Sequence, residues 1–453
     1  MRRRVILILA VSAVSGVAQT AKPRENLRGL TSEAISNNPE IVAAQERYES
    51  ARQRPTQESS LPDPKVSVGY TSVGNPLPGA GLGSQVLANA RLMVSQEVPF
   101  PGKLKLKGDI AYTDAQAKFE QYQSVQLAVV SRLKQAYYRL QYTYAISDVL
   151  VRNRALLEQF LKATEDRYSV GKAVQQDVFK AQMQLTVIET RIVKIEQERR
   201  SREAEINSLL NRAAGSPINR PEDEPPKDLT ATLEGLFTSA REKSPILARD
   251  RKLIQRSELA ANIARKNLYP DVTLNAGYYN RGGMPPAYEI RADFAIPLYS
   301  WRKQRAGVNE RVSDLSQTRS AYEASDQTLR AQIQDEFSKA QASARLMKLY
   351  AQTQAPQLHG ALATPTTSNE DELFVAQAAQ NLRTISGQIV LLQSDMALRA
   401  SIIGYETGTV DFPSVLSSAS VVLEFEMNYY DEALNYSLAL SRLEEITGQP
   451  LTN

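Results

Sequence analysis

Apolar residues recur along much of this chain every three or four positions, which is the period of an α-helix packed on one side. No proline interrupts the stretch from Lys103 to Tyr168. We therefore expect one helix of about 65 residues there, roughly 100 Å long, which no compact domain needs. The positions that carry the helical period are Leu127, Val130, Leu133, Tyr137, Leu140 and Tyr144, then Leu185, Ile188, Ile192 and Ile195, and finally Val422, Phe425, Tyr429, Tyr436, Leu440 and Leu443.

Short stretches alternate apolar and polar residues instead, as β-strands with two different faces do. Between Tyr288 and Ile296 the apolar side chains point one way, and Glu289, Arg291 and Asp293 point the other. The same alternation begins at Val66 and at Val272, and glycine-rich loops at 74–83 and 281–286 join the strands. This pattern is typical of strands in a membrane β-barrel, although a soluble sandwich would show it too.

One unit occurs twice in the chain. Pro39 and Pro245 each open a polar helix, and Pro64 and Pro270 each follow the end of one, so both pairs are 206 residues apart. Further matches join 98–100 with 296–298, 168–171 with 405–408, and 215–218 with 448–451. Each unit reads helix, strand, loop, strand, long helix, turn, long helix.

These matches divide the chain into four parts. Residues 1–20, with a cationic start and an apolar run of about a dozen residues, predict a secretory signal peptide. Residues 21–210 form the first unit, the proline-rich and acidic stretch 211–228 is a linker, and 229–453 form the second unit. The second unit is longer than the first, and we expect its extra residues, near 357–393, to form a surface excursion.

Composition excludes several classes of function. There is no cysteine and a single histidine, His359, so a zinc or copper site is not expected. The net charge of +4 gives no basic footprint for nucleic acid. No phosphate-binding loop, nucleophile elbow or Ser-His-Asp set occurs, so we expect no catalytic residues and no cofactor. No later apolar run approaches the roughly 20 residues that a membrane-spanning helix needs.

Three motifs resemble the TolC family of outer-membrane efflux proteins. Residues 95–103, Ser-Gln-Glu-Val-Pro-Phe-Pro-Gly-Lys, look like the strand-to-helix junction of its heavy-metal and cation efflux branch. Residues 167–172 and 405–412 look like the family's two periplasmic tips. The resemblance implies a mostly α-helical protein with a β-barrel part, in which three chains close a twelve-stranded outer-membrane barrel above a periplasmic α-helical barrel.

At the tips, Gly171 and Gly408 are expected to supply the tight reversals between helices, and Tyr168 and Tyr405 precede them. We expect these four residues to form the surface that contacts a periplasmic adaptor. Asp177 and Asp411 could cap the returning helices or line the pore rim. Asp177, six residues past its glycine, is expected nearly two turns inside its helix and is therefore assigned to the rim. Asp411 is the better capping candidate.

The function that the resemblance implies is passive conduction across the outer membrane, with no enzymatic activity. Solutes such as metal cations or small toxic compounds would arrive from an inner-membrane pump through the adaptor. The partners would then be two further copies of the chain, the adaptor, the pump and outer-membrane lipid, and no nucleic acid. Two alternatives stay open: a type I protein-secretion conduit, and a periplasmic coiled-coil protein that does not conduct.

Overall fold

The computed structural model describes residues 24–223, 226–352, 400–405 and 407–451. The signal peptide, His359 and the extra segment near 357–393 lie outside these residues. The first unit comprises α1 (Leu27–Asn37), α2 (Pro39–Ser59), β1 (Lys65–Thr71), β2 (Asn89–Val98), α3 (Lys103–Ser169) and α4 (Gln175–Leu209). The second comprises α5 (Leu233–Lys243), α6 (Pro245–Lys266), β3 (Val272–Arg281), β4 (Met284–Phe294), the π-helical turn η1 (Ser300–Gln304), α7 (Arg305–Gln352) and α11 (Phe412–Thr447).

Among the described residues, each unit runs from two shorter helices through two strands into a long helix. The long helix α3 contains 67 residues, in agreement with the absence of proline along it. Local signals fix where the shorter helices start. Asn38 accepts hydrogen bonds from the amides of Glu40 (2.9 Å) and Ile41 (3.3 Å), and Pro39 occupies the first helical position, where its missing N–H is not needed.

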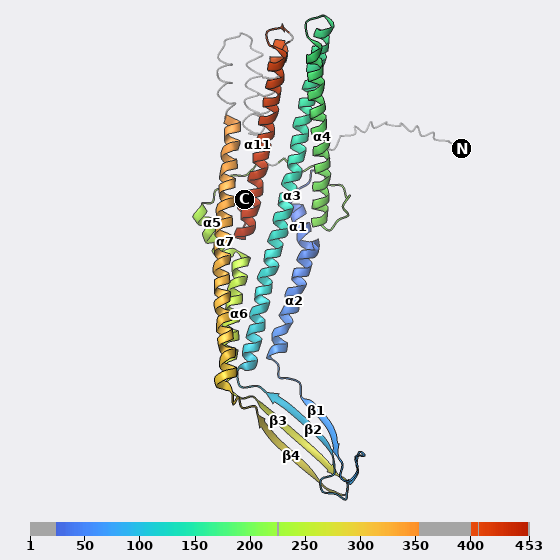
Figure 1. Ribbon diagram of the computed structural model, residues 1–453, viewed down its shortest axis with the longest axis vertical. Helices are drawn as coiled ribbons and strands as arrows, with labels where there is room; N and C mark the ends of the chain where they lie inside the picture. Colours follow the sequence, from blue (N-terminus) through green and yellow to red (C-terminus); the bar gives the residue numbers. More distant parts are fainter. Residues whose placement is uncertain (1–23, 224–225, 353–399, 406, 452–453) are drawn as a thin grey trace, which may run out of the picture.

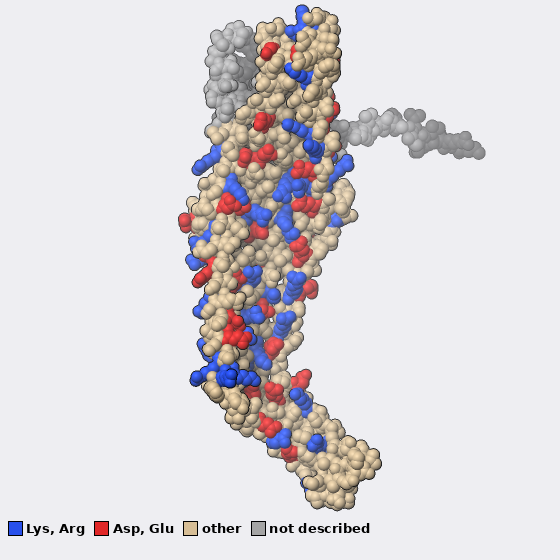
Figure 2. Space-filling view, in the orientation of Figure 1, with Lys and Arg blue, Asp and Glu red and all other residues tan. Residues whose placement is uncertain are grey.

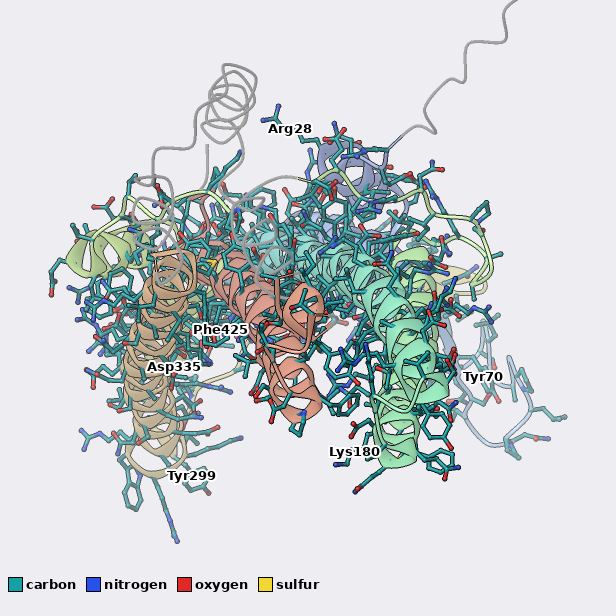
Figure 3. The ribbon with its side chains drawn as sticks, turned by 90° about the horizontal axis from the view of Figure 1, so that it is seen from above. Arg28, Tyr70, Lys180, Tyr299, Asp335 and Phe425 are labelled. Carbon is teal, nitrogen blue, oxygen red and sulfur yellow. The ribbon has the colours of Figure 1, made fainter. Side chains whose placement is uncertain are left out.

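The helices form a single curved wall (Figures 1 and 3). In its half next to the sheet, contacts run in the order α2, α3, α6, α7, and in the far half in the order α4, α3, α11, α7. The wall ends at α2 and α4 on one flank and at α7 on the other. The small helices α1 and α5 lie near the middle, and the strands extend from the lower end at an angle to the wall (Figure 1).

The buried face of the wall agrees with the helical period in most places. Leu133, Tyr137 and Leu140 of α3 are buried, as is Ile188 of α4. The expectation is wrong in the upper half of α11. There the buried side chains include Ala419, Leu423 and Glu426, whereas Val422 is half-buried. Phe425 is exposed and packs edge-on against Tyr350 of α7.

Between α4 and α5, residues 210–223 and 226–232 cross the wall without forming a helix. Pro221 pairs with Glu25, and Arg220 forms an ion pair with Asp148 of α3 at 2.7 Å. Farther along, the hydroxyl of Tyr436 of α11 donates a hydrogen bond to the carbonyl of Lys227 at 2.8 Å. This crossing segment therefore ties the long helices of the two units together.

The four strands form one antiparallel sheet in the order β1, β2, β3, β4. Val68 lies opposite Leu92, Leu92 opposite Tyr278, and Tyr278 opposite Tyr288, so apolar side chains share one face across all four strands. Residues 72–88 connect β1 to β2, whereas only Gly282 and Gly283 connect β3 to β4. The loop expected at 281–286 is thus shorter, because Pro285 and Pro286 belong to β4.

Candidate conduit surfaces

The two faces of the sheet differ sharply in polarity. On the apolar face, Val68 is 83% and Ile290 is 93% exposed in the single chain, so nothing in the described residues covers them. The opposite face carries a charged network. Arg291 pairs with Glu289 at 3.1 Å and with Asp293 at 2.9 Å, and the Asn275 amide donates to Asp293 at 2.8 Å. The sheet therefore offers one surface suited to lipid and one suited to water.

Both long edges of this sheet, on β1 and on β4, have no partner strand among the described residues. An open edge leaves a row of backbone N–H and C=O groups unpaired, which is unfavourable in lipid. None of the described helices is long and apolar enough to cross a membrane.

At the far end of the wall, the turns after Tyr168 and Tyr405 have the same hydrogen bonds. The Gly171 amide donates to the Tyr168 carbonyl at 3.0 Å, and the Gly408 amide donates to the Tyr405 carbonyl at 3.0 Å. The next amide along reaches one residue further back, at 2.8 Å in both turns. Both glycines have the left-handed backbone that such helix ends require, with φ of 75° and 83°.

The two tyrosines of the tips have different environments. Tyr168 is 46% exposed, whereas Tyr405 is 4% exposed and packs against the rings of Phe160 and Phe412 at centroid distances of 5.3 and 6.1 Å. Arg167 lies over the Tyr405 ring at 4.7 Å and donates to its carbonyl at 2.6 Å. Tyr405 therefore holds the two tips together, and Tyr168 alone of the pair presents a large free side-chain surface. Their contact with an adaptor stays a prediction.

The two tip carboxylates both lie at helix starts. Asp411 caps α11 by accepting a hydrogen bond from the Ser414 amide at 3.2 Å, and its hydrogen bonds with Ser414 lower the pKa of its carboxyl. Asp177 is half-buried in the first turn of α4, which starts at Gln175. The expectation that Asp177 lies two turns inside its helix is wrong, because residues 170–174 are not helical. Whether either residue lines a pore stays a prediction.

A contact between the two units, which the sequence pattern did not reveal, sits where the sheet meets the wall. The ammonium of Lys103, in the first turn of α3, donates to both carboxylate oxygens of Asp271 at 2.9 and 3.0 Å and to the Tyr269 carbonyl at 3.3 Å. The Phe100 amide donates to the same carboxylate at 2.6 Å. Burial raises the pKa of Asp271, but the hydrogen bonds from Lys103 and Phe100 outweigh it and lower that pKa below its ordinary value.

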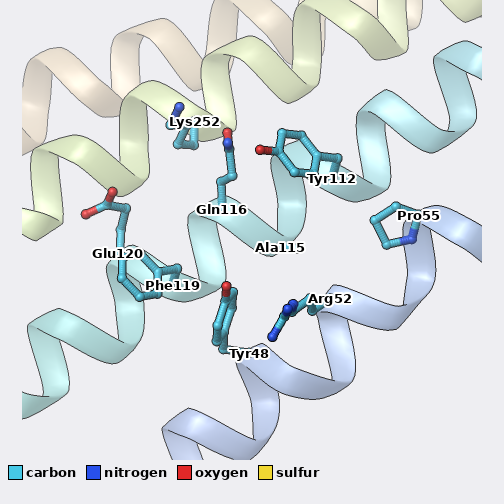
Figure 4. A pocket seen from close by; sticks show the side chains of 9 residues that line it. All are labelled: Tyr48, Arg52, Pro55, Tyr112, Ala115, Gln116, Phe119, Glu120 and Lys252. Carbon is cyan, nitrogen blue, oxygen red and sulfur yellow. The ribbon is translucent and has the colours of Figure 1, made fainter.

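A cavity of about 330 Å³ lies between α2, α3 and α6 (Figure 4). Rings of Tyr48, Tyr112 and Phe119 line it together with Glu120 and Lys252. Burial raises the pKa of the Glu120 carboxyl, while the charges of Lys252 and Arg251 oppose that shift. The lining contains no Ser, Thr, Cys or His. No group of His, Cys, Asp or Glu in the described ranges could hold a metal ion.

Residues 30–212 and 236–364 match the outer membrane efflux protein family. The chain belongs to this family. Its fold is similar to that of the outer-membrane channel OprN, with a TM-score of 0.71 and 14% identity over 94% of this chain and 90% of that one. For CusC the TM-score is 0.72 and the identity is 15%, over 96% of this chain and 95% of that one. For VceC from Vibrio cholerae the TM-score is 0.71 and the identity is 17%, over 94% of this chain and 96% of that one. No curated protein sequence matches this chain.

As an outer membrane efflux protein, the chain is located in the outer membrane, with a large periplasmic helical part. The predictions of a TolC-type family, of a mostly helical fold with an antiparallel strand part, and of this location are confirmed. The family and the similar structures are channels. The helical wall is accordingly the periplasmic part of the efflux protein.

Proposed function

We propose that three copies of this efflux protein close into one tube. The observation that carries the proposal is the sheet: its apolar face is bare, and both of its edges are open. Joining β4 of one copy to β1 of the next removes every edge and satisfies the backbone in lipid. The helical wall, open at α7 on one flank and at α2 and α4 on the other, would close in the same way.

The tube conducts solutes passively out of the cell and catalyses no reaction. The charged network of Glu289, Arg291 and Asp293 then faces water in the lumen, and the apolar face meets lipid. A periplasmic adaptor contacts the tips around Tyr168, Gly171 and Gly408, and an inner-membrane pump supplies the cargo. We infer metal cations or small toxic compounds as that cargo, because residues 95–103 resemble the junction of the cation efflux branch. The bare apolar face favours this function over a coiled-coil rod that does not conduct.

Closure is tested by chemical cross-linking of the full-length protein in detergent, followed by mass determination. The expected product has three times the mass of one chain. A protein that remains a single chain at every cross-linker concentration would overturn the proposal.

Conduction and charge selectivity are tested by single-channel recording in planar bilayers. If Asp177 and Asp411 line the rim, three-fold symmetry presents each as a ring of carboxylates that favours cations. Asp177→Asn and Asp411→Asn should each lower the cation-to-anion permeability ratio while the trimer stays intact. Glu234→Gln, on the short helix α5 far from both tips, is the matched control and should not change the ratio. If both tip variants keep the parent's ratio, neither residue lines the constriction.

A further inference from the structure

Basic residues gather where the helical wall meets the sheet, at the level of the elbow in Figure 2. They come from the first turns of α3, the last turn of α6, η1 and the start of α7. No acidic residue occurs in 99–108, 261–270 or 295–309, the three segments that contribute them. We call this set the basic collar; it consists of Lys105, Lys107, Arg265, Lys266, Arg302, Lys303 and Arg305.

The collar cations differ from those higher on the same wall. None of the seven forms an ion pair with a carboxylate in the part of the chain that the structure describes. By contrast, the next four basic residues along α7 each have such a partner. Arg311 pairs with Asp314 at 3.1 Å, and Arg319 pairs with Glu258 at 2.8 Å. Among the described residues, the collar therefore has no carboxylate within ion-pair distance of any of its seven cations.

Exposed aromatic and apolar side chains adjoin the collar. Trp301 is 66% and Tyr299 is 71% exposed, and Tyr299 extends away from the wall when the molecule is seen from above (Figure 3). Residues 295–298 link them to β4, whose last residue, Phe294, belongs to the apolar face of the sheet. Trp and Tyr concentrate at the boundary between hydrocarbon and water, where an apolar ring and a polar group are both satisfied.

We propose that the basic collar binds the phosphate headgroups of anionic phospholipids in the leaflet that faces the periplasm. Three observations carry the proposal: cations that form no ion pair in the described residues, aromatic side chains beside them, and continuity with the bare apolar face. The proposal rests on the membrane insertion of the sheet given under the proposed function. The expected attraction is substantial, because each basic residue near an anionic membrane surface strengthens binding by roughly fivefold.

Trp301 is the single tryptophan of the chain, so its fluorescence reports on the collar directly. The full-length protein is reconstituted into phosphatidylcholine vesicles that contain a nitroxide-labelled lipid, either phosphatidylglycerol or phosphatidylcholine, at equal mole fraction. Labelled phosphatidylglycerol should quench Trp301 at least about twofold more than labelled phosphatidylcholine. The difference should disappear near 1 M salt, where the screening length falls to about 3 Å.

Variants identify the charges responsible. Arg302→Gln/Lys303→Gln/Arg305→Gln should make the two labelled lipids quench equally. The charge-conserving variant Arg302→Lys/Arg305→Lys should retain the difference, and it covers the case in which the triple variant fails to fold. The matched control Arg311→Gln/Arg319→Gln, higher on α7, should also retain it.

Three outcomes would overturn the proposal. The first is equal quenching by both lipids in the parent, and the second is no quenching by either lipid, which would mean that a neighbouring copy covers Trp301. The third is loss of the difference in quenching when inorganic phosphate is added at constant ionic strength. That last outcome would indicate a phosphate site instead of a lipid surface. Trimer mass and conductance are measured on the same preparation. If they are normal while quenching is equal, only the lipid proposal fails; if the parent forms no trimer, the proposed function fails.

Discussion

The contact between Lys103 and Asp271 allows a sharp test of how the sheet is held to the helical wall. Lys103 is 5% exposed, so Asp271→Asn leaves a buried ammonium with only neutral acceptors, the new amide and the Tyr269 carbonyl. Leaving one charge of a buried pair uncompensated costs about 3–5 kcal/mol. Because the Asp271 side chain is 33% exposed and water can reach the pair, we reduce the expected cost to about 2 kcal/mol.

Hydrogen exchange at the Phe100 amide is the direct readout, since this amide donates to the Asp271 carboxylate at 2.6 Å. A loss of about 2 kcal/mol corresponds to roughly thirtyfold faster local opening and exchange. The double variant Lys103→Met/Asp271→Asn should recover part of the protection, because it leaves no charge buried.

The exposed pair Arg319–Glu258, at 2.8 Å between α7 and α6, is the matched control. Exposed ion pairs contribute less than about 1 kcal/mol, so Arg319→Gln should change local exchange by no more than about fivefold. Exchange at Phe100 in Asp271→Asn within about twofold of the parent would show instead that the pair contributes almost nothing to the junction.

Further expectations concern the sheet, a tip and acid stability. Ile290→Arg should prevent assembly of the trimer in membranes at a cost of about 2–4 kcal/mol, whereas Thr273→Arg on the polar face should be tolerated. Equal amounts of trimer for the two variants on gel electrophoresis would contradict the assignment of faces. Gly171→Ala should lower the thermal midpoint of unfolding, measured by circular dichroism, because the left-handed backbone costs an alanine about 1–2 kcal/mol. Gly29→Ala, inside a helix, should not lower it. Similar midpoints for the two variants would count against the tip geometry. Because folding lowers the pKa of Asp271, this carboxyl contributes fully to stability at pH values above its ordinary pKa of 3.8, and the contribution is lost as the pH falls through the lowered pKa. If the parent and Asp271→Asn lose stability in parallel below pH 3.8 in acid unfolding, this linkage is excluded.

Repeat and period predicted much of the architecture. The matched prolines Pro39 and Pro245 lie at the starts of α2 and α6, and the long stretch without proline correctly indicated α3. What they left open is how the units pack on each other. In α11 the period alone favoured Val422 and Phe425, but contact with α3 buries Leu423 and Glu426 instead, because the direction of the neighbouring helix decides which stripe faces the core.

The tips show the same limit at the level of single residues. Tyr168 and Tyr405 occupy matching positions in the repeat, and their turns have the same hydrogen bonds. Only Tyr405 is enclosed, because Phe160 and Phe412 flank it. Lys103 and Asp271 are likewise far apart in the chain and meet only through folding. Asp271 directly precedes β3 and Lys103 follows β2 by five residues, so their pairing is a property of the assembled sheet.

The two hairpins at the far end of the sheet differ in the length of their connections, and this difference determines where a foreign peptide can be inserted. Leu77, in the connection formed by residues 72–88, is exposed and lies outside the paired strands. On the other hairpin, Arg281 and Met284 still pair across the two-residue turn, so any addition there would separate bonded strands. A peptide epitope grafted beside Leu77 would thus leave the strand register unaltered, whereas the same graft between Gly282 and Gly283 would disturb the sheet that carries it.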